Sequence, residues 1–281
     1  MIYQLKERLK IEFEKQDRSG IYGYTQRHLA YNSNKIEGSR LTEKQTANLF
    51  ETGTFMGEDT IFRAKDVEEM TGHFTMFNYM LQTFQEPLNE GLIKEYHYRL
   101  KAGVFEDLAN GYPIGQYKNR KNIVSDIETV LPQDVPNKMN ELIKWYESSP
   151  KDLKSIMKYH AMFEKIHPFQ DGNGRVGRLI IFKECLRNDI VPLIIESDRK
   201  VDYYYFLNDA QHKGEYEKLY QFAKEEQIVY EKQVKEFLGL ENDINQELFS
   251  TLEEIESPIQ SVMRKYEDKC PERTKVYDLE R

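Results

Sequence analysis

The sequence predicts an all-α fold that carries one small β-hairpin flap and an appended C-terminal helical segment. Apolar residues recur at the spacing of an α-helix along most of the chain. The segment 116–136, "QYKNRKNIVSDIETVLPQDVP", differs because it is short, partly β-branched and closed by two prolines. The alternation of strands and helices that an α/β fold requires is missing from the pattern.

Each expected helix has its own local signal. In the segment 41–51, Thr42 and Gln45 have the spacing of a capping box, which marks a helix N-terminus. In 152–166, Leu153, Ile156 and Phe163 fall on one helical stripe. Further helices are expected over 66–84, 92–105, 136–149, 176–189 and 203–240, the last with a break near Gly214.

Composition indicates a water-soluble chain. Its 281 residues are 39% hydrophobic, enough for a substantial core, and 31% charged, with a formal net charge of −8. Nucleic acid is not an implied partner, because nonspecific binding requires clustered Lys and Arg. No apolar run approaches the length that spans a bilayer, so no membrane partner is expected.

The sequence also indicates a cytoplasmic location. The N-terminal segment "MIYQLKERLKIEFEKQ" mixes charged and apolar residues, so no secretory signal is expected. The two cysteines, Cys185 and Cys270, could pair, but two in a chain of this length favour reduced thiols. We expect one domain over residues 1–240 and a helical tail over 241–281, which Pro258 and Pro271 interrupt.

One short stretch, "HPFQDGNGRVGR" from His167 to Arg178, concentrates unusual chemistry. It contains the glycine pattern of a dinucleotide fold, but a helical stripe precedes it where that fold needs a buried strand. It also begins like a calcium loop, yet Arg175, Val176 and Phe182 occupy the fifth, sixth and twelfth positions, where oxygen ligands and a glycine are required. Neither interpretation fits the surrounding sequence.

A phosphate site fits better. If Gly172, Asn173 and Gly174 begin a helix, their free backbone N–H groups form a cradle for an anion. Arg175 and Arg178 then project from the same helical face, and their planar guanidinium groups suit phosphate oxygens. A carboxylate beside a polyphosphate commonly holds Mg²⁺, which Asp171 could do. His167 would serve as a general base for a hydroxyl nucleophile.

The stretch resembles the signature of the Fic (Fido) family, HxFx[DE]GNGRxxR, and matches it at every specified position. The similarity extends over about residues 31–226. The family consists mostly of AMP-transferases that act on protein hydroxyls, so the resemblance implies a protein adenylyltransferase that uses ATP and Mg²⁺ or Mn²⁺. Its targets would be Ser, Thr or Tyr side chains, and pyrophosphate would be released. Because family members often dimerise, a homodimer is also expected.

The resemblance also implies roles by position. His167 would deprotonate the target hydroxyl, and Asp171 would coordinate the metal ion. Gly172, Asn173 and Gly174 would hold the α-phosphate, and Arg175 and Arg178 the β- and γ-phosphates, with Val176 and Gly177 inside the same ATP site. The flap would contain Asn122, Ile123, Val124 and Ser125, and the nucleoside side Tyr203, Tyr204 and Gln211.

An inhibitory helix is implied further upstream. "SNKIEG" matches the family's inhibitory pattern [ST]xxxE[GN], with Ser33 and Glu37 at its two ends. In that class the glutamate pairs with the second arginine of the motif, which is Arg178 here. Glu37 would therefore weaken AMP transfer by occupying the γ-phosphate position. Removal of AMP by hydrolysis, transfer of another nucleotide and a non-catalytic phosphate-binding regulator remain the alternative functions.

Overall fold

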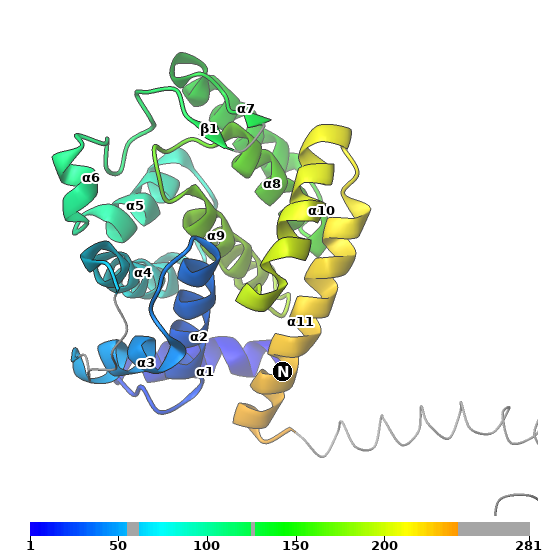
Figure 1. Ribbon diagram of the computed structural model, residues 1–281. Helices are drawn as coiled ribbons and strands as arrows, with labels where there is room; N and C mark the ends of the chain where they lie inside the picture. Colours follow the sequence, from blue (N-terminus) through cyan, green and yellow to red (C-terminus); the bar gives the residue numbers. More distant parts are fainter. Residues whose placement is uncertain (55–61, 125–126, 241–281) are drawn as a thin grey trace, which may run out of the picture. The chain divides into compact units, whose positions relative to one another are not determined.

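The computed structural model describes residues 1–54, 62–124 and 127–240, and for residues 123–128 it describes no side chains. Helices dominate these residues (Figure 1), and the predicted helical class is confirmed. The helices are α1 (Ile2–Glu14), α2 (Ile21–Ile36), α3 (Glu43–Thr52), α4 (Ala64–Thr83), α5 (Glu90–Lys101), α6 (Phe105–Ala109), α7 (Val135–Ser148), α8 (Leu153–Ile166), α9 (Asn173–Arg187), α10 (Lys200–Lys213) and α11 (Glu217–Leu238). Short 3₁₀ turns cover Pro132–Asp134 and Ser197–Arg199.

Strand pairing in the described part of the chain is confined to one short hairpin within the segment predicted as a flap. Strands β1 (Ile123–Val124) and β2 (Ile127–Glu128) are antiparallel, with Ile123 opposite Glu128 and Val124 opposite Ile127. Ser125, which the sequence places in this flap, lies outside the described residues.

Helix α9 is the central element and lies against α2, α4, α5 and α8 (Figure 1). Its apolar side chains face several directions, and Val176, Leu179, Ile180, Ile181 and Phe182 are all buried. A helix that is buried on all sides belongs in the centre of a core. The sequence expected to hold phosphate begins this helix, so its first turn is held in place by a buried helix.

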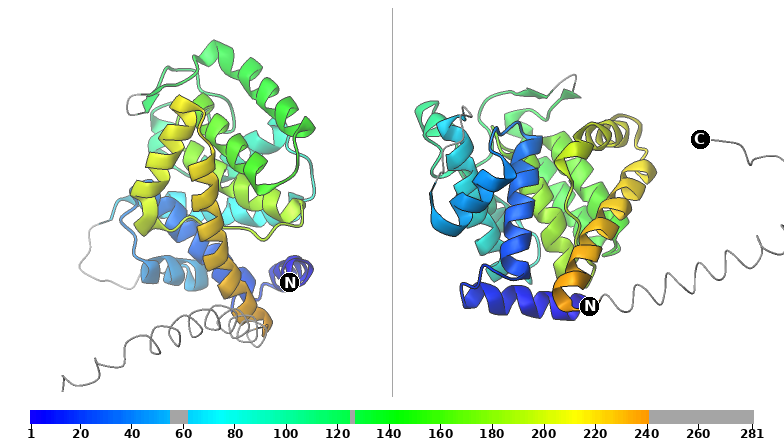
Figure 2. Two further views of the ribbon diagram at one scale, coloured as in Figure 1. Left: turned by 90° about the vertical axis from the view of Figure 1, so that its right-hand side faces the viewer. Right: turned by 60° about the horizontal axis from the view of Figure 1, so that its bottom comes forward.

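Helix α2 brings its C-terminal end to the first turn of α9. It packs between α1, α3 and α4, and α1 crosses beneath it (Figure 2). The helix ends at Ile36, Glu37 is its C-cap, and Gly38 follows with a φ of +88°. A left-handed glycine is a common helix stop, as the sequence predicts for Gly38.

Most helix boundaries follow their local signals. The Thr42 side chain accepts from the Gln45 N–H and the Gln45 side chain accepts from the Thr42 N–H, which confirms the capping box. The break near Gly214 is also present, with a φ of +71°. The helix expected over 92–105 is interrupted: α5 ends at Lys101, and the extended backbone of Val104 starts the separate α6.

Residues Met1–Val234 form one compact unit, and Lys235–Arg281 are grouped separately. Most of that second unit lies outside the described residues, so the tail expected over 241–281 stays a prediction. No described helix combines the length and the apolar character that a membrane crossing requires. Cys185 is buried on α9 with a free thiol, whereas Cys270 lies beyond residue 240.

Candidate active site

His167 stands at the junction between α8 and the loop that leads to α9. It is the C-cap of α8 and has a left-handed φ of +51°, a conformation that few non-glycine residues adopt. Its N–H donates to the Phe163 carbonyl at 2.9 Å, which closes the end of the helix. Strained backbone of this kind is common at functional sites and is maintained by the surrounding packing.

The His167 imidazole is neutral at pH 7. Burial, with a contribution from the Lys118 ammonium, lowers its pKa to about 4. Asn122 Nδ2 lies 2.9 Å from Nδ1, and Asn173 Nδ2 lies 3.0 Å from the same atom. A neutral imidazole can accept a proton, so His167 has the protonation state that a general base requires.

His97 fixes the loop between His167 and Asp171. Its ring stacks on Phe169, with centroids 3.9 Å apart. The Gly115 N–H donates to Nδ1 at 2.9 Å, so the proton of the neutral ring resides on Nε2, which donates to the Asp171 carbonyl at 3.0 Å. This buried histidine therefore holds the backbone that carries Asp171.

The first turn of α9 forms an anion-attracting surface. Gly172 is its N-cap with a φ of +85°, and no side chain in the described residues caps this end. The helix dipole and the first N–H groups favour negative charge there. A Cβ atom placed on Gly174 would lie only 2.2 Å from Glu37 Oε1, so the Glu37 carboxylate already sits against this turn.

Arg178 connects α9 to the end of α2. Its Nε donates to Ser33 Oγ at 3.0 Å, and its Nη2 donates to the Ser33 carbonyl at 2.9 Å and to Glu37 Oε1 at 2.7 Å. Burial alone would lower the pKa of Arg178, but Glu37 and the hydroxyls of Tyr203 and Tyr204 outweigh it and raise that pKa. The guanidinium is therefore charged and engaged by α2.

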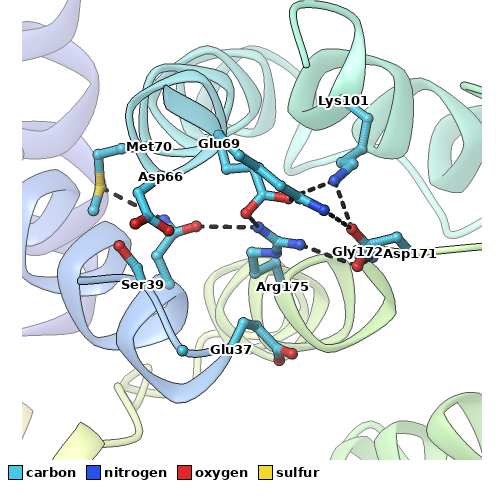
Figure 3. A network of polar contacts seen from close by, with 12 residues as sticks. Glu37, Ser39, Asp66, Glu69, Met70, Lys101, Asp171, Gly172 and Arg175 are labelled. Carbon is cyan, nitrogen blue, oxygen red and sulfur yellow. Dashed lines mark hydrogen bonds and ion pairs between the residues drawn. The ribbon is translucent and has the colours of Figure 1, made fainter. Parts of the chain in front are cut away.

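Arg175 belongs to a second network with acidic partners (Figure 3). It contacts Glu69 at 2.5 Å and Asp171 at 3.3 Å, and Lys101 contacts the same two carboxylates at 2.5 and 2.8 Å. Burial would raise the pKa of Asp171, but Arg175, Lys101 and Lys65 hold it well below its usual range. Asp171 is thus a carboxylate anion at any pH near neutrality.

A metal ion fits Asp171 only from its exposed side. Oxygens of Glu69, Asp107 and Asp171 lie within 4.8 Å of one another, an arrangement that could hold a cation. The ammonium of Lys101 contacts all three and lies 2.5 Å from Asp107, so it fills this cage. The Asp171 side chain keeps 32% exposure, which suits Mg²⁺ held by one carboxylate together with phosphate oxygens and water.

A family model described as the Fic/DOC family matches residues 87–184, which include α5, the hairpin, α8, the complete motif and most of α9. Residues 87–184 of this chain thus resemble the Fic/DOC family. The chain is 29% identical over 188 residues to a protein adenylyltransferase Fic of Nematostella vectensis, which covers 65% of this chain and 42% of the relative. A protein of the same name from Aedes aegypti is 28% identical over 184 residues, covering 64% of this chain and 36% of that protein.

Solved Fic structures share the fold. A Fic domain containing signaling protein from Bacteroides thetaiotaomicron has a TM-score of 0.59 at 26% identity, covering 73% of this chain and 81% of that chain. Fic-1 from Caenorhabditis elegans has a TM-score of 0.66 at 18% identity, covering 86% and 72%. The chain spans less than half the length of the two protein adenylyltransferase relatives that it matches.

The Fic motif of this chain comes together as a single site, and the predicted flap and nucleoside residues lie around it at different depths. Asn122 contacts His167 directly, and Ile123 and Val124 form β1. Tyr203 is buried below Arg178, whose guanidinium carbon lies 5.9 Å from the tyrosine ring centroid.

The other two predicted nucleoside residues differ in accessibility. Tyr204 is 39% exposed, so it can still contact a ligand. Gln211 Nε2 donates to the Ala161 carbonyl at 3.3 Å, so its amide holds α10 against α8.

Two further motif residues, Val176 and Gly177, serve the packing of α9. Val176 is buried, and a Cβ atom on Gly177 would lie 2.6 Å from Glu164 Oε1, so Gly177 permits the close approach of α8.

Sequence reasoning missed four residues that shape this Fic site, namely Glu69, His97, Lys101 and Lys118. None of them belongs to the motif, and each lies 49 or more positions before His167 in the chain. Their helical or loop segments carry no local sequence signal for a site. Only the fold places Glu69, His97 and Lys101 next to Asp171. It likewise places Lys118 next to Asn122, which contacts His167.

Proposed function

We propose that this chain transfers AMP from ATP to a hydroxyl side chain, Ser, Thr or Tyr, of a target protein and releases pyrophosphate. The observation that carries the proposal is the position of a neutral imidazole, His167, beside the uncapped first turn of α9, with Arg175 and Arg178 on that same helix. A base and an anion cradle within one loop suit the attack of a hydroxyl on a phosphate. The similar proteins of Nematostella vectensis and Aedes aegypti are named protein adenylyltransferases, which supports the same activity.

Each group then has a defined task. His167 takes the proton of the target hydroxyl, and the N–H groups at the start of α9 hold the α-phosphate as negative charge develops. Arg178 holds the γ-phosphate once its guanidinium has separated from Glu37. Arg175, which already contacts Asp171 at 3.3 Å, binds the β-phosphate beside that carboxylate. Positioning and charge stabilisation dominate such transfers.

Asp171 would hold Mg²⁺ or Mn²⁺ together with the phosphates of ATP. The ion would supply positive charge that offsets the charge developing on the leaving pyrophosphate. Lys101 and Lys65 keep the carboxylate ionised and fixed in place. We further propose that residues 1–240 contain all of this machinery, so that the segment from residue 241 is an appended tail.

Autoinhibition by Glu37 is part of the proposal. The Glu37 carboxylate contacts Arg178 at 2.7 Å and lies against Gly174, so it occupies the side of α9 where phosphate oxygens would bind. Its negative charge would also repel them. ATP would therefore bind in a pose that is poorly suited to attack until Glu37 moves away from Arg178.

The decisive test is incubation of the purified full chain with Mg²⁺, candidate target proteins and ATP labelled at either the α- or the γ-phosphate. We expect label from the α-position on protein, none from the γ-position, and an AMP adduct in mass spectra. His167→Ala should lower the rate by roughly 10²–10⁴-fold. The exposed His212 on α10, changed to Ala, is the matched control and should leave the rate unchanged.

Three outcomes would contradict the proposal. Label that reaches protein from the γ-phosphate would indicate phosphorylation instead. Tight ATP binding without transfer, even after Glu37 is replaced, would indicate a phosphate-binding regulator. Loss of AMP from a modified target, without any forward transfer, would indicate a hydrolase.

A further inference from the structure

The two ends of the β1–β2 hairpin are tied together by one buried lysine. Asn122 directly precedes β1, and Thr129 directly follows β2. Lys118 Nζ donates to Asn122 Oδ1 at 2.7 Å and to Thr129 Oγ1 at 2.8 Å, and the Lys118 backbone N–H donates to the Pro168 carbonyl at 2.8 Å. Lys118 is only 3% exposed, and both side-chain partners offer neutral oxygens. Lys118 therefore anchors the base of the hairpin to the motif loop.

This lysine determines which way the Asn122 amide faces. An ammonium group has donors and no acceptor, so the atom that it contacts must be the amide oxygen. The Thr129 hydroxyl, which accepts from Lys118, donates to oxygens of the same Asn122 at 2.8 Å. The Asn122 NH₂ group consequently faces the opposite way, toward His167 Nδ1 at 2.9 Å and the Phe169 carbonyl at 3.2 Å.

An NH₂ group only donates, so the ring nitrogen that it contacts must be unprotonated. Asn173 also turns its NH₂ group toward the imidazole, because its Oδ1 accepts from the Phe169 N–H at 2.8 Å, but this contact does not distinguish the two ring nitrogens. Asn173 Nδ2 lies 3.0 Å from Nδ1 and 3.3 Å from Nε2, so its donation is shared along the ring edge. Asn122 contacts Nδ1 more directly. The neutral ring of His167 thus carries its proton on Nε2.

We propose that Lys118 and Asn122 are positioning residues that orient His167 and hold its proton on Nε2, so that Nδ1 is the nitrogen that accepts the target's proton. The inference rests on the proposed function and adds the atom that acts and the residues that prepare it. The target hydroxyl takes the place of the Asn122 N–H at Nδ1. Its proton passes to Nδ1 as its oxygen bonds to the α-phosphorus and the bond from that phosphorus to pyrophosphate breaks. The electron pair leaves on pyrophosphate, and the imidazolium later returns its proton to solvent.

The arrangement links the hairpin to the base. Asn122 is the residue that enters β1, so a target segment that pairs with the hairpin would bind next to the amide that covers Nδ1. Lys118 makes no hydrogen bond to His167 or to the α9 cradle, so apart from the charge that it places near the imidazole, its influence on the reaction passes through Asn122 and through the loop. This separation lets a variant of Lys118 test positioning without removing any group that contacts the reacting atoms.

The first measurement needs no enzymatic activity. In the full chain labelled with ¹⁵N-histidine, two-bond ¹⁵N–¹H correlation spectra distinguish the protonated ring nitrogen from the unprotonated one, and the His167→Ala variant assigns the signals. We expect the Nε2–H form for His167 at pH 7.5. Asn122→Asp, which replaces the donor with an acceptor, should shift the proton to Nδ1. An Nδ1–H form in the unaltered chain would overturn the inference.

The second measurement separates positioning from general structure. Lys118→Met should mix the two His167 tautomers and lower kcat for AMP transfer by on the order of 10–100-fold, with KM for ATP unchanged. Lys121→Met, which alters an exposed lysine of the same segment, should change neither. Unchanged tautomer and kcat in Lys118→Met would overturn the assignment. A chain that shows the expected tautomer but transfers no AMP would support this inference while contradicting the proposed function.

Discussion

At the scale of single residues, variants of Asp171 can distinguish a metal-binding role of this carboxylate from a purely structural one. Its carboxylate accepts from the Gly172 N–H at 2.7 Å, which a helix-start residue would do in any protein. It also has three cationic neighbours, Lys65 at 3.3 Å, Lys101 at 2.8 Å and Arg175 at 3.3 Å, which keep it ionised although it is largely enclosed. Asparagine at this position keeps the hydrogen bond and removes the charge.

We therefore expect Asp171→Asn to remain folded and to lose AMP transfer by on the order of 100-fold or more at every Mg²⁺ concentration tested. Asp171→Ala should lose transfer to the same extent. The measurement pairs transfer rates across a metal titration with melting temperatures. If Asp171 only caps the turn, the Ala variant will lose roughly 0.5–2 kcal/mol of stability and keep most of its activity.

Glu69 is a structural counterpart on α4. It is buried and neutralises both Arg175 and Lys101, each at 2.5 Å. Removing one member of a buried ion pair leaves an uncompensated charge and costs roughly 3–5 kcal/mol. We expect urea unfolding of Glu69→Ala to show that loss. Glu68→Ala, which removes a more exposed neighbour, is the control, and an equal loss in both variants would contradict the role of Glu69.

These residues also indicate what a sequence can reveal about a site. The groups from His167 to Arg178 are contiguous, so their shared chemistry is visible before any fold is known. Glu69 and Lys101 belong to α4 and α5, and along those helices they occupy ordinary polar positions. Their meeting with Asp171 depends on how the two helices pack around α9, and no local pattern encodes that contact.

At the scale of elements, the end of α2 contacts the first turn of α9 and engages Arg178. Glu37 follows the last residue of α2, so its backbone is held by a helix end and a left-handed glycine, and its carboxylate reaches both Arg178 and Gly174. A hydrogen bond to a charged group typically contributes roughly 1.5–3 kcal/mol. If the proposed autoinhibition holds, that range is the free energy that ATP has to overcome to displace Glu37 from Arg178.

Glu37→Gly should accordingly raise AMP transfer by about 10–150-fold, the factor to which that free energy corresponds. Transfer rates and ATP affinity of the two forms are the measurement. Arg178→Ala should be inactive with or without Glu37→Gly, because the γ-phosphate then has no partner. Transfer and ATP binding that are both unchanged in Glu37→Gly would show that α2 is not an inhibitor. A fall in AMP removal in the same variant would assign Glu37 a hydrolytic role as well.

Elements differ in how far local signals determine them. Thr42, Gln45 and Gly214 act through their own backbone neighbours, and the predicted cap and break are therefore confirmed. The segment 92–105 shows the opposite, because its helical period continues through Val104 while the chain turns after Lys101. Lys101 reaches Glu69, Asp107 and Asp171 from the end of α5, so tertiary ion pairs stabilise that boundary.

At the scale of the whole molecule, buried histidines link stability to pH. Burial lowers the pKa of His73, His97 and His160 to about 3 and that of His167 to about 4, so four of the six histidines stay neutral in the folded chain. In the unfolded chain, each of these four histidines would bind a proton below about pH 6.5. The unfolded state therefore binds more protons in this range, and stability falls as the pH drops below 6.5.

Glu164, a buried carboxylic acid, makes stability depend on pH in the opposite direction. Burial, only partly offset by Arg178, raises the pKa of Glu164 to about 8, so the folded chain keeps this proton between pH 4.5 and 8 while the unfolded chain releases it. Its contribution is present at low pH and is lost as the pH rises through 8. Near pH 5 the four histidines and Glu164 together leave a net difference of about three protons, which corresponds to about 4 kcal/mol per pH unit, and the difference shrinks toward pH 6.5 as the unfolded histidines lose their protons.

We expect urea unfolding of the full chain at pH 5.0, 5.5 and 6.0 to show a steep loss of stability toward acid with a slope near that value. Glu164→Gln removes the opposing proton and should steepen the slope by about 1.4 kcal/mol per pH unit. His73→Phe fills a fully buried position with an apolar ring and should reduce the slope by the same amount. A stability that is flat between pH 5.0 and 6.0, or a slope that neither substitution alters, would mean that these side chains do not titrate as their burial requires.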